Sequence, residues 1–442
     1  MIRKIALAGF LLLAVLPLAA DNTANYILVV YPRYSGSDVA AQYGLTITDF
    51  PAPNIFKVSA PSTVGSSQLI QQVAADSRVQ DFELDGIAHH PEMSAANLNQ
   101  STAGILDQLP SVSVVSYFGN QVPSYYVNQT ATSLIRLADA QTTKGATGAG
   151  IVAVIDTGVD PNHAALKGAL LPGYDLTRNQ AGASEWLDLN QSTAGILDQS
   201  TAGILDMNRV TVLNQSTAAI LDQSTAGILD PTTIPQCFGH GTMVAGIVHL
   251  VAPTATILPL KAFYSDCTAP VSRIIRAIHY AVNNGASVIN LSADIGPNSD
   301  PALRAAVDFA TDKGVVVVAS AGNSGAQLTV YPAGYSDALG VASTNLQDQQ
   351  STFTNYGSVA SMAAPGEAIQ TTYPGNFYAA AWGTSFSTPF VSGTVALLQQ
   401  FDATLNYTAA AAAFSAPGDC VFINPNLGWG RLDVYGAVSY FH

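Results

Sequence analysis

The second half of the chain alternates uninterrupted apolar segments with longer segments of mixed polarity, and this alternation restricts the possible folds more than any other feature of the sequence. The apolar segments, rich in β-branched residues, are IVAVIDTG (151–158), TILPLKAFY (256–264), SVINLSA (287–293), GVVVVASAG (314–322) and ALGVAST (338–344). Between them, residues 271–285 and 301–314 have helical periodicity. Buried strands separated by helices predict an α/β domain over residues 129–442, with a parallel sheet covered by helices on both faces. Catalytic groups are then expected at strand ends and helix starts.

The chain begins with a segment typical of export. MIRK precedes the apolar run IALAGFLLLAVLPLAA, which has the length of a signal-peptide core rather than of a transmembrane helix. We therefore expect residues 1–20 to be a cleaved signal peptide, the protein to be secreted, and no membrane contact after cleavage. A retained membrane anchor is the alternative.

Residues 21–91 have the pattern of a small α+β domain. Strand-like and helical segments follow one another in the order βαββαβ, at 24–32, 37–44, 45–50, 54–61, 67–77 and 79–86. The domain is expected to end near His89 and His90, where the composition changes.

A repeated octad lies in the regions between these domains. Residues 92–128 form a predicted linker rich in Ser, Asn and Gln, and residues 178–231 form a predicted insertion in the α/β domain. QSTAGILD, or QSTAAILD at 215–222, occurs at 100–107, 191–198, 199–206, 215–222 and 223–230. An eight-residue period fits neither a helix face nor a coiled coil. The octads could form a β-rich, adhesive appendage, but we favour an expanded surface loop, because loops tolerate insertions.

Charge and composition restrict the classes of partner. The formal net charge is −14 at pH 7, and Lys and Arg form no cluster. Phosphate binding requires such clusters, so we expect no nucleic-acid partner. Apolar residues make up 48% and charged residues 10% of the chain, which is typical of a soluble globular protein.

Four short sequences carry groups suited to catalysis. They are VIDTGVD (154–160), FGHGTMVAG (238–246), ASAGNSG (319–325) and WGTSFSTPFVSG (382–393). Each one alone is weak, because an Asp at a strand end is usually a cap and a His beside Gly is usually structural.

Together they supply what acyl transfer to a serine requires. Ser385 would be the nucleophile, His240 the base, Asp156 the group that orients the base, and Asn323 a donor to the oxyanion. Asp156 ends an apolar run, whereas His240 and Ser385 each begin a helical segment. At a helix start, the backbone N–H of Ser385 has no intrahelical partner and can also donate to an oxyanion.

These four sequences, in the order Asp, His, Ser, resemble the signatures of the subtilisin-like serine proteases. The resemblance covers residues 129–442 and implies the family's fold and a serine endopeptidase of broad specificity. Residues 21–91 are similar to the family's inhibitor-type propeptide, which implies a self-processing zymogen; an unrelated small domain is the alternative.

The resemblance also implies a substrate cleft and a disulfide. An extended peptide would pair with Ser292, Ala293 and Asp294, and Ala321, Gly322 and Asn323 would line the S1 pocket. A bridge between Cys237 and Cys267 would be similar to one in the aqualysin and proteinase K group. Cys420 would remain outside it.

The chain also departs from the family. Where many members use a carboxylate to bind calcium, nine residues after the catalytic Asp, this chain has Ala165. We assign no metal ligands and expect no cofactor in the chemistry. Calcium could bind elsewhere, through Asp160 or Asp175, although such scattered carboxylates more often form a solvated surface.

Two other functions are alternatives to a broad endopeptidase. A catalytically silent, protease-like binding module would use the octads for attachment, but all four catalytic positions are intact. A maturation protease of narrow specificity would keep the chemistry and act on one target. In either enzyme, we expect peptide or protein substrates, the propeptide as inhibitor, and a monomer.

Overall fold

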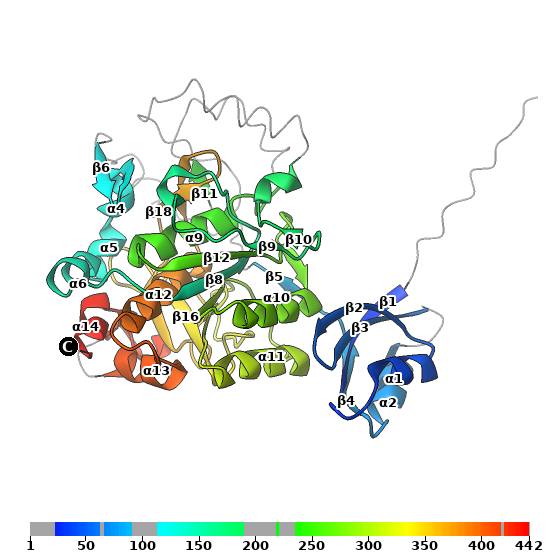
Figure 1. Cartoon of the computed structure of the whole chain (residues 1–442). Helices are drawn as coiled ribbons and strands as arrows, with labels where there is room; N and C mark the ends of the chain where they lie inside the picture. The colour runs from blue at the N-terminus through cyan, green and yellow to red at the C-terminus, as the bar shows by residue number, and fades with distance from the viewer. Residues whose placement is uncertain are drawn as a thin grey trace, which may run out of the picture.

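The computed structural model describes residues 23–61, 66–90, 113–189, 218–220, 235–416 and 420–441. They form a small N-terminal unit and a large domain (Figure 1). The expected signal peptide and four of the five octads lie outside the described residues. Within the described part of the chain, no helix is long and apolar enough to cross a membrane.

The N-terminal unit has the βαββαβ order that the sequence predicts. Its strands form an antiparallel sheet in the order β2-β3-β1-β4, and two helices cover one side of it. Tyr26, Leu28 and Phe82 lie in its separate hydrophobic core. The elements are β1 (Thr23–Val30), α1 (Gly36–Gln42), β2 (Thr46–Ala52), β3 (Ile55–Pro61), α2 (Ser66–Ala74) and β4 (Val79–Leu84).

The large domain is built on one sheet in the order β10-β9-β12-β8-β14-β15-β16-β17-β21-β20. The strands from β9 to β21 are parallel, as expected, whereas the short outer strands β10 and β20 pair antiparallel with their neighbours. The strands are β8 (Ile151–Asp156), β9 (Tyr174–Asp175), β10 (Gln180–Ala181), β12 (Thr256–Lys261), β14 (Val288–Leu291), β15 (Val316–Ser320), β16 (Ala338–Thr344), β17 (Met362–Pro365), β20 (Cys420–Val421) and β21 (Arg431–Leu432).

Helices cover both faces of this sheet, which confirms the predicted α/β class. In β8, Val152 and Val154 belong to the core under α9 (His240–Val251) and α12 (Thr384–Gln399). Ala153 and Ile155 belong to the opposite core, under α10 (Val271–Asn283) and α11 (Pro301–Asp312). A strand that faces two cores needs an uninterrupted apolar sequence, which explains the pattern of IVAVID.

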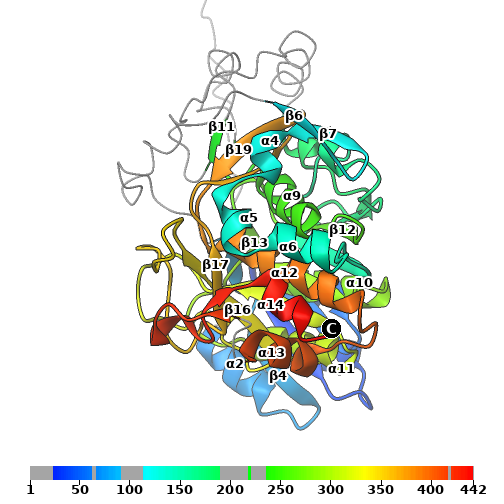
Figure 2. The same cartoon turned by 90° about the vertical axis from the view of Figure 1, so that its left-hand side faces the viewer.

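The remaining helices lie at the edges of the domain. Figure 2 shows α6 (Leu137–Thr143) beside α14 (Val434–Ser439), close to the C-terminus. α13 (Tyr407–Ser415) lies nearby, and short helical turns occupy η2 (Ala164–Leu166), η3 (Glu185–Asp188) and η4 (Pro425–Leu427).

The end of the predicted linker belongs structurally to the large domain. Residues 113–128 form the hairpin β6 (Val114–Tyr117) and β7 (Asn120–Pro123), followed by α4 (Ser124–Val127); α5 (Thr130–Leu134) comes next. Tyr126 is fully buried, and its hydroxyl donates to the carbonyl of Gly246 at 2.7 Å. The boundary at residue 129 was therefore placed too late, because aromatic contacts fix this segment on α9.

The predicted insertion also begins later than residue 178. Within residues 178–189, Ala183 is buried in the domain and Glu185 in η3 is fully buried. Of the octad at 215–222, the structure describes β11 (Ala218–Ile220), which pairs antiparallel with β19 (Phe377–Ala381). β18 (Ile369–Tyr373) completes this small sheet.

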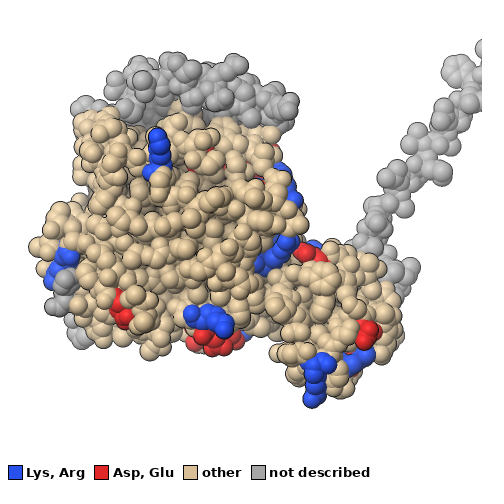
Figure 3. Space-filling view, viewed as in Figure 1, with Lys and Arg blue, Asp and Glu red and all other residues tan. Residues whose placement is uncertain are grey.

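Charged side chains are sparse on the face of the molecule shown in Figure 3. Lys and Arg occur there singly or in small groups over both the large domain and the N-terminal unit. This distribution is consistent with the low content of charged residues in the sequence.

Candidate active site

Asp156 and His240 meet at the carboxyl end of the central strand. Asp156 is the last residue of β8 and His240 is the first of α9, and His240 Nδ1 lies 2.7 Å from Asp156 Oδ1. The helix start comes very close to the turn after β8, since a Cβ at Gly241 would lie 2.0 Å from the carbonyl oxygen of Gly158. Glycine at 241 therefore allows the imidazole to reach the carboxylate.

The carboxylate of Asp156 is stabilised in its ionised form. Burial alone would raise its pKa, but nearby His240, its hydrogen bond and the Thr157 N–H, at 2.7 Å, lower the pKa below the usual value. An ionised Asp156 fixes the tautomer of His240 with the proton on Nδ1, which leaves Nε2 to act as a base.

Glu185 lies behind this pair, and the sequence analysis did not identify it. Its carboxylate accepts from the Gly239 N–H at 2.6 Å and from the hydroxyl groups of Thr242 and Thr157. It thus joins the turn after β8 to the start of α9. Burial raises the pKa of Glu185 to about 8, although these hydrogen bonds oppose the shift.

Ser385 and Asn323 lie at the start of α12. Asn323 Oδ1 accepts from the N–H of Thr384 at 3.0 Å and from its hydroxyl at 2.9 Å, so the amide nitrogen points away from Thr384. A Cβ at Gly383 would lie 3.0 Å from that nitrogen. Both the Asn323 amide and the second residue of α12, Ser385, therefore present donors at this helix start.

The residues expected to bind substrate lie beside Ser385 and the start of α12. Ser292 Oγ donates to the Ser385 carbonyl at 2.9 Å, and Ser385 Oγ lies 3.4 Å from the carbonyl oxygen of Ser292. Ala293 follows on the same segment and is buried. Ala321 and Gly322 follow β15, and the N–H of Gly322 donates to Thr384 Oγ1 at 3.2 Å, next to Asn323.

The tail of the N-terminal unit lies between Asp294 and residues 268–270, a position that we call the cleft. β5 (Ile87–His89) pairs antiparallel with β13 (Thr268–Pro270), and on its other side His89 exchanges two backbone hydrogen bonds with Asp294, at 2.8 and 2.9 Å. The His90 N–H donates to the carbonyl of Cys267 at 3.0 Å. The tail is therefore held on both edges by main-chain pairing, as an extended peptide would be.

His90 reaches the catalytic pair itself. Its ring lies 4.1 Å from the His240 ring and 4.0 Å from the Phe263 ring, centroid to centroid. His90 Nδ1 lies 2.7 Å from the Ser292 carbonyl oxygen, and Nε2 lies 3.5 Å from Asp156 Oδ1. Burial and the neighbouring His240 lower the pKa of His90 to about 3, so its imidazole is neutral near pH 7.

Carboxyl groups of the N-terminal unit also contact the starts of two helices. The Asp85 carboxylate accepts from the N–H and the hydroxyl of Ser272 in α10, at 2.9 and 2.8 Å, and pairs with Lys57. Glu83 accepts from the N–H of Ala302 in α11 at 3.2 Å. Burial and the neighbouring Asp300 raise the pKa of Glu83 to about 10, so its carboxyl is neutral near pH 7 and contributes a hydrogen bond rather than a charge. Both contacts attach the unit to the large domain.

A disulfide joins Cys237 to Cys267. It links the segment just before His240 to the residue whose carbonyl receives the His90 N–H. Cys420 is outside this bridge.

The calcium-binding position does not fit a metal. Ala165 is buried in η2 and offers no carboxylate. Asp160 and Asp175 are buried rather than solvated, and both accept hydrogen bonds from protein groups. The sequence-based alternative of a solvated surface was therefore wrong for these two residues.

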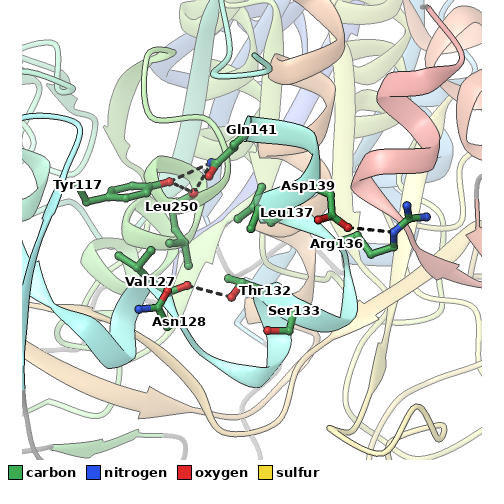
Figure 4. A pocket seen from close by; sticks show the side chains of 11 residues that line it. Tyr117, Val127, Asn128, Thr132, Ser133, Arg136, Leu137, Asp139, Gln141 and Leu250 are labelled. Carbon is green, nitrogen blue, oxygen red and sulfur yellow. Dashed lines mark hydrogen bonds and ion pairs between the residues drawn. The ribbon is translucent and has the colours of Figure 1, made fainter. Parts of the chain in front are cut away.

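A separate pocket of about 290 Å³ lies between α4, α5, α6 and the end of α9 (Figure 4). Its polar groups bond mainly to one another: the Tyr117 hydroxyl donates to the Leu250 carbonyl, and Gln141 donates to the Tyr117 hydroxyl. Because these polar groups already bond to one another, we interpret the pocket as structural.

Comparisons with known proteins agree with this geometry. Residues 148–413 match the sequence profile of the subtilase family, peptidase S8. The chain is 40% identical over 171 residues to subtilisin BL from Lederbergia lenta, which covers 37% of this chain and 63% of that protein. It is 33% identical over 301 residues to thermitase from Thermoactinomyces vulgaris. That alignment covers 65% of this chain and 88% of thermitase.

A solved structure with the same fold spans nearly the whole chain. Fervidolysin from Fervidobacterium pennivorans, a keratinolytic enzyme related to subtilisin, superposes with a TM-score of 0.67 at 18% identity, over 96% of this chain and 62% of that one. At this identity the likeness establishes the fold alone. The family profile, the identity to thermitase and the shared fold together place the chain in the subtilase family, the subtilisin-like serine endopeptidases.

Proposed function

We propose that this subtilase is a secreted endopeptidase of broad specificity, made as a precursor that inhibits and then cuts itself. One observation carries the proposal: the tail of the N-terminal unit lies in the cleft between β13 and Asp294, with His90 against His240. The unit therefore occupies the position of a substrate and excludes other peptides from it.

The chemistry follows from the four residues at the two helix starts and the end of β8. His240 removes the proton of the Ser385 hydroxyl, Ser385 Oγ attacks the peptide carbonyl carbon, and Asp156 stabilises the imidazolium that forms. His240 then gives the proton to the leaving amine as the C–N bond breaks. Water, activated by the same imidazole, hydrolyses the acyl-enzyme and regenerates Ser385.

The negative charge of the tetrahedral intermediate needs donors that are already in place. The Asn323 amide, held by Thr384, and the Ser385 N–H at the start of α12 fill this role. Because neither donor has to move, their dipoles stabilise the oxyanion without a cost in reorganisation.

The first peptide bond to be cut would lie near Pro91, the predicted end of the propeptide. His90, the residue before it, lies against the ring of His240. Cleavage there breaks the covalent link between the unit and the large domain. The backbone pairs and the Asp85 contacts would still hold the cut unit in place as an inhibitor.

Broad specificity follows from the manner of binding. The tail is held by backbone hydrogen bonds to Asp294 and Cys267, and any extended peptide could make bonds of this kind whatever its side chains. The disulfide is in accord with an oxidising compartment outside the cell.

The test is the fate of the precursor with Ser385→Ala, expressed in a host without other proteases. We expect it to remain uncut near residue 91 and to hydrolyse no peptide, as seen by mass spectrometry and a fluorogenic peptide assay. Ser387→Ala is the matched control, because Ser387 is buried two residues further along the same helix, and it should still be processed. Normal processing of Ser385→Ala would refute self-cleavage.

A further inference from the structure

The contact between His90 and Asp156 leaves two electron-rich atoms facing each other. His90 Nδ1 lies 2.7 Å from a carbonyl oxygen, which can only accept, so Nδ1 carries the proton of the neutral ring. His90 Nε2 then presents a lone pair, 3.5 Å from Asp156 Oδ1. Both side chains are fully buried. A lone pair and a carboxylate oxygen at this distance repel each other unless a cation lies between them.

Donors from His240 and Thr157 stabilise Asp156 Oδ1 itself, but they leave two other buried atoms of this contact without a partner. Among the residues that the structure describes, neither His90 Nε2 nor Asp156 Oδ2 has a hydrogen-bond partner. Buried polar atoms normally find a partner, and those that lack one call for an explanation such as an ion.

We propose that the closed precursor binds a zinc ion between His90, Asp156 and His240. One ligand atom from each of the three residues lies within 4.8 Å of the others, and all three side chains are buried. Two imidazoles and a carboxylate are a common ligand set for Zn²⁺ with a fourth position left for water. His240 would coordinate through Nδ1, and the proton that this atom now shares with Asp156 would leave to solvent.

The orientation of His90 supports this site. A histidine that binds zinc usually donates its other ring N–H to a carbonyl or a carboxylate, which fixes the tautomer and aims the free nitrogen at the metal. Ser292 provides such a carbonyl on the side of the ring opposite to Asp156.

The site would regulate the enzyme, because one ligand comes from the N-terminal unit and two come from the catalytic pair. Bound zinc would hold the tail in the cleft and prevent His240 from acting as a base. Once the unit leaves, only two ligands remain, and the affinity for zinc falls. This step rests on the proposed function, whereas the existence of the metal site does not.

Zinc binding is measured on the full precursor carrying Ser385→Ala, so that no cleavage occurs during the experiment. The metal-free protein is titrated with Zn²⁺ against a chromophoric chelator. Adding His90→Asn keeps a donor near the Ser292 carbonyl but removes Nε2, and affinity should fall at least about tenfold. His89→Asn is the matched control, because His89 is exposed and adjacent, and it should leave the affinity unchanged.

The outcomes decide the proposal. Equal zinc affinity with and without His90→Asn, or no competition with the chelator, would overturn it. If His90→Asn unfolds the precursor, as judged by circular dichroism, Asp156→Asn in the same background provides a second removal of a ligand, and it should also weaken binding by about tenfold or more.

A second measurement uses the precursor with Ser385 intact. Zn²⁺ should slow the appearance of the cut form, a chelator should accelerate it, and His90→Asn should abolish both effects. A rate of cutting that is equally zinc-sensitive in His90→Asn would contradict the regulatory role. A precursor that never cuts itself would instead refute the proposed self-processing, while the titration would still decide whether the metal site exists.

Discussion

At the scale of single residues, Asn323 is the group whose contribution should be confined to the transition state. Its Oδ1 is held by two donors of Thr384, so the amide is fixed before substrate arrives. We expect Asn323→Ala to lower kcat by about 10² to 10³, a range taken from the equivalent donor in this family, with little change in KM. Steady-state kinetics on a peptide substrate measure both. An unchanged kcat would remove Asn323 from the oxyanion hole.

Glu185 leads to a prediction about stability and pH. Its pKa is raised from 4.5 to about 8 in the folded protein, so between these pH values the folded state keeps a proton that the unfolded state has lost. Through this group, the free energy of unfolding should therefore decrease as pH rises across that range, by up to about 1.4 kcal/mol per pH unit. Glu185→Gln cannot ionise and should remove this decrease.

Urea unfolding between pH 5 and pH 8 tests this pH dependence. It is measured on Glu185→Gln and on its parent, and both proteins carry Ser385→Ala to prevent autolysis. All other titrating groups are common to both proteins, so the difference between the two curves isolates Glu185. Parallel curves would mean that Glu185 ionises normally and that only its hydrogen bonds matter.

At the scale of elements, the N-terminal unit is attached by carboxyl groups at helix starts rather than by surface ion pairs. Asp85 is almost fully buried, with its side chain 1% exposed, and bonds to Ser272 at the start of α10. Hydrogen bonds to a charged group contribute about 1.5 to 3 kcal/mol, so Asp85→Ala should speed release of the cut unit by roughly tenfold to a hundredfold. The lag before activity appears in the processed precursor reports this rate.

Asp49→Ala is the control for that experiment. Asp49 contacts Arg276 of α10 across the same boundary, at 3.4 Å, but its side chain is 41% exposed. An exposed pair contributes at most about 1 kcal/mol, so this variant should change the lag by less than about fivefold. Equal effects of the two variants would show that capping of α10 is not what holds the unit.

At the scale of the whole molecule, the disulfide connects the catalytic helix to the wall of the cleft. Cys237 and Cys267 enclose a loop of 30 residues in sequence separation. In the chain-entropy account, a loop of this length stabilises the folded state by about 3 to 4 kcal/mol. Replacing both cysteines by Ser, in the Ser385→Ala background, should lower the free energy of unfolding by that amount. Cys420→Ser leaves the bridge intact and should change it little; a similar loss in both variants would argue against the entropic explanation.

The sequence alone determined the class of fold and predicted the candidate catalytic residues. Apolar runs such as IVAVID specify strands buried on both faces. Such a strand needs an apolar side chain at every consecutive position, so it can be recognised from local sequence. Asp156, His240 and Ser385 could be identified for a similar reason, since each stands at a strand end or a helix start that local sequence defines.

The tertiary structure decided the features that depend on contacts between distant segments. Glu185 reads as an ordinary acidic residue in a loop until the fold buries it between the turn after β8 and the start of α9. Tyr126 reads as part of a linker until it packs under Gly246. His90 marks only the end of a small domain in the sequence, and it becomes a neighbour of Asp156 and His240 because β5 pairs with β13. Burial and partners are properties of the folded chain, so local pattern could not reveal them.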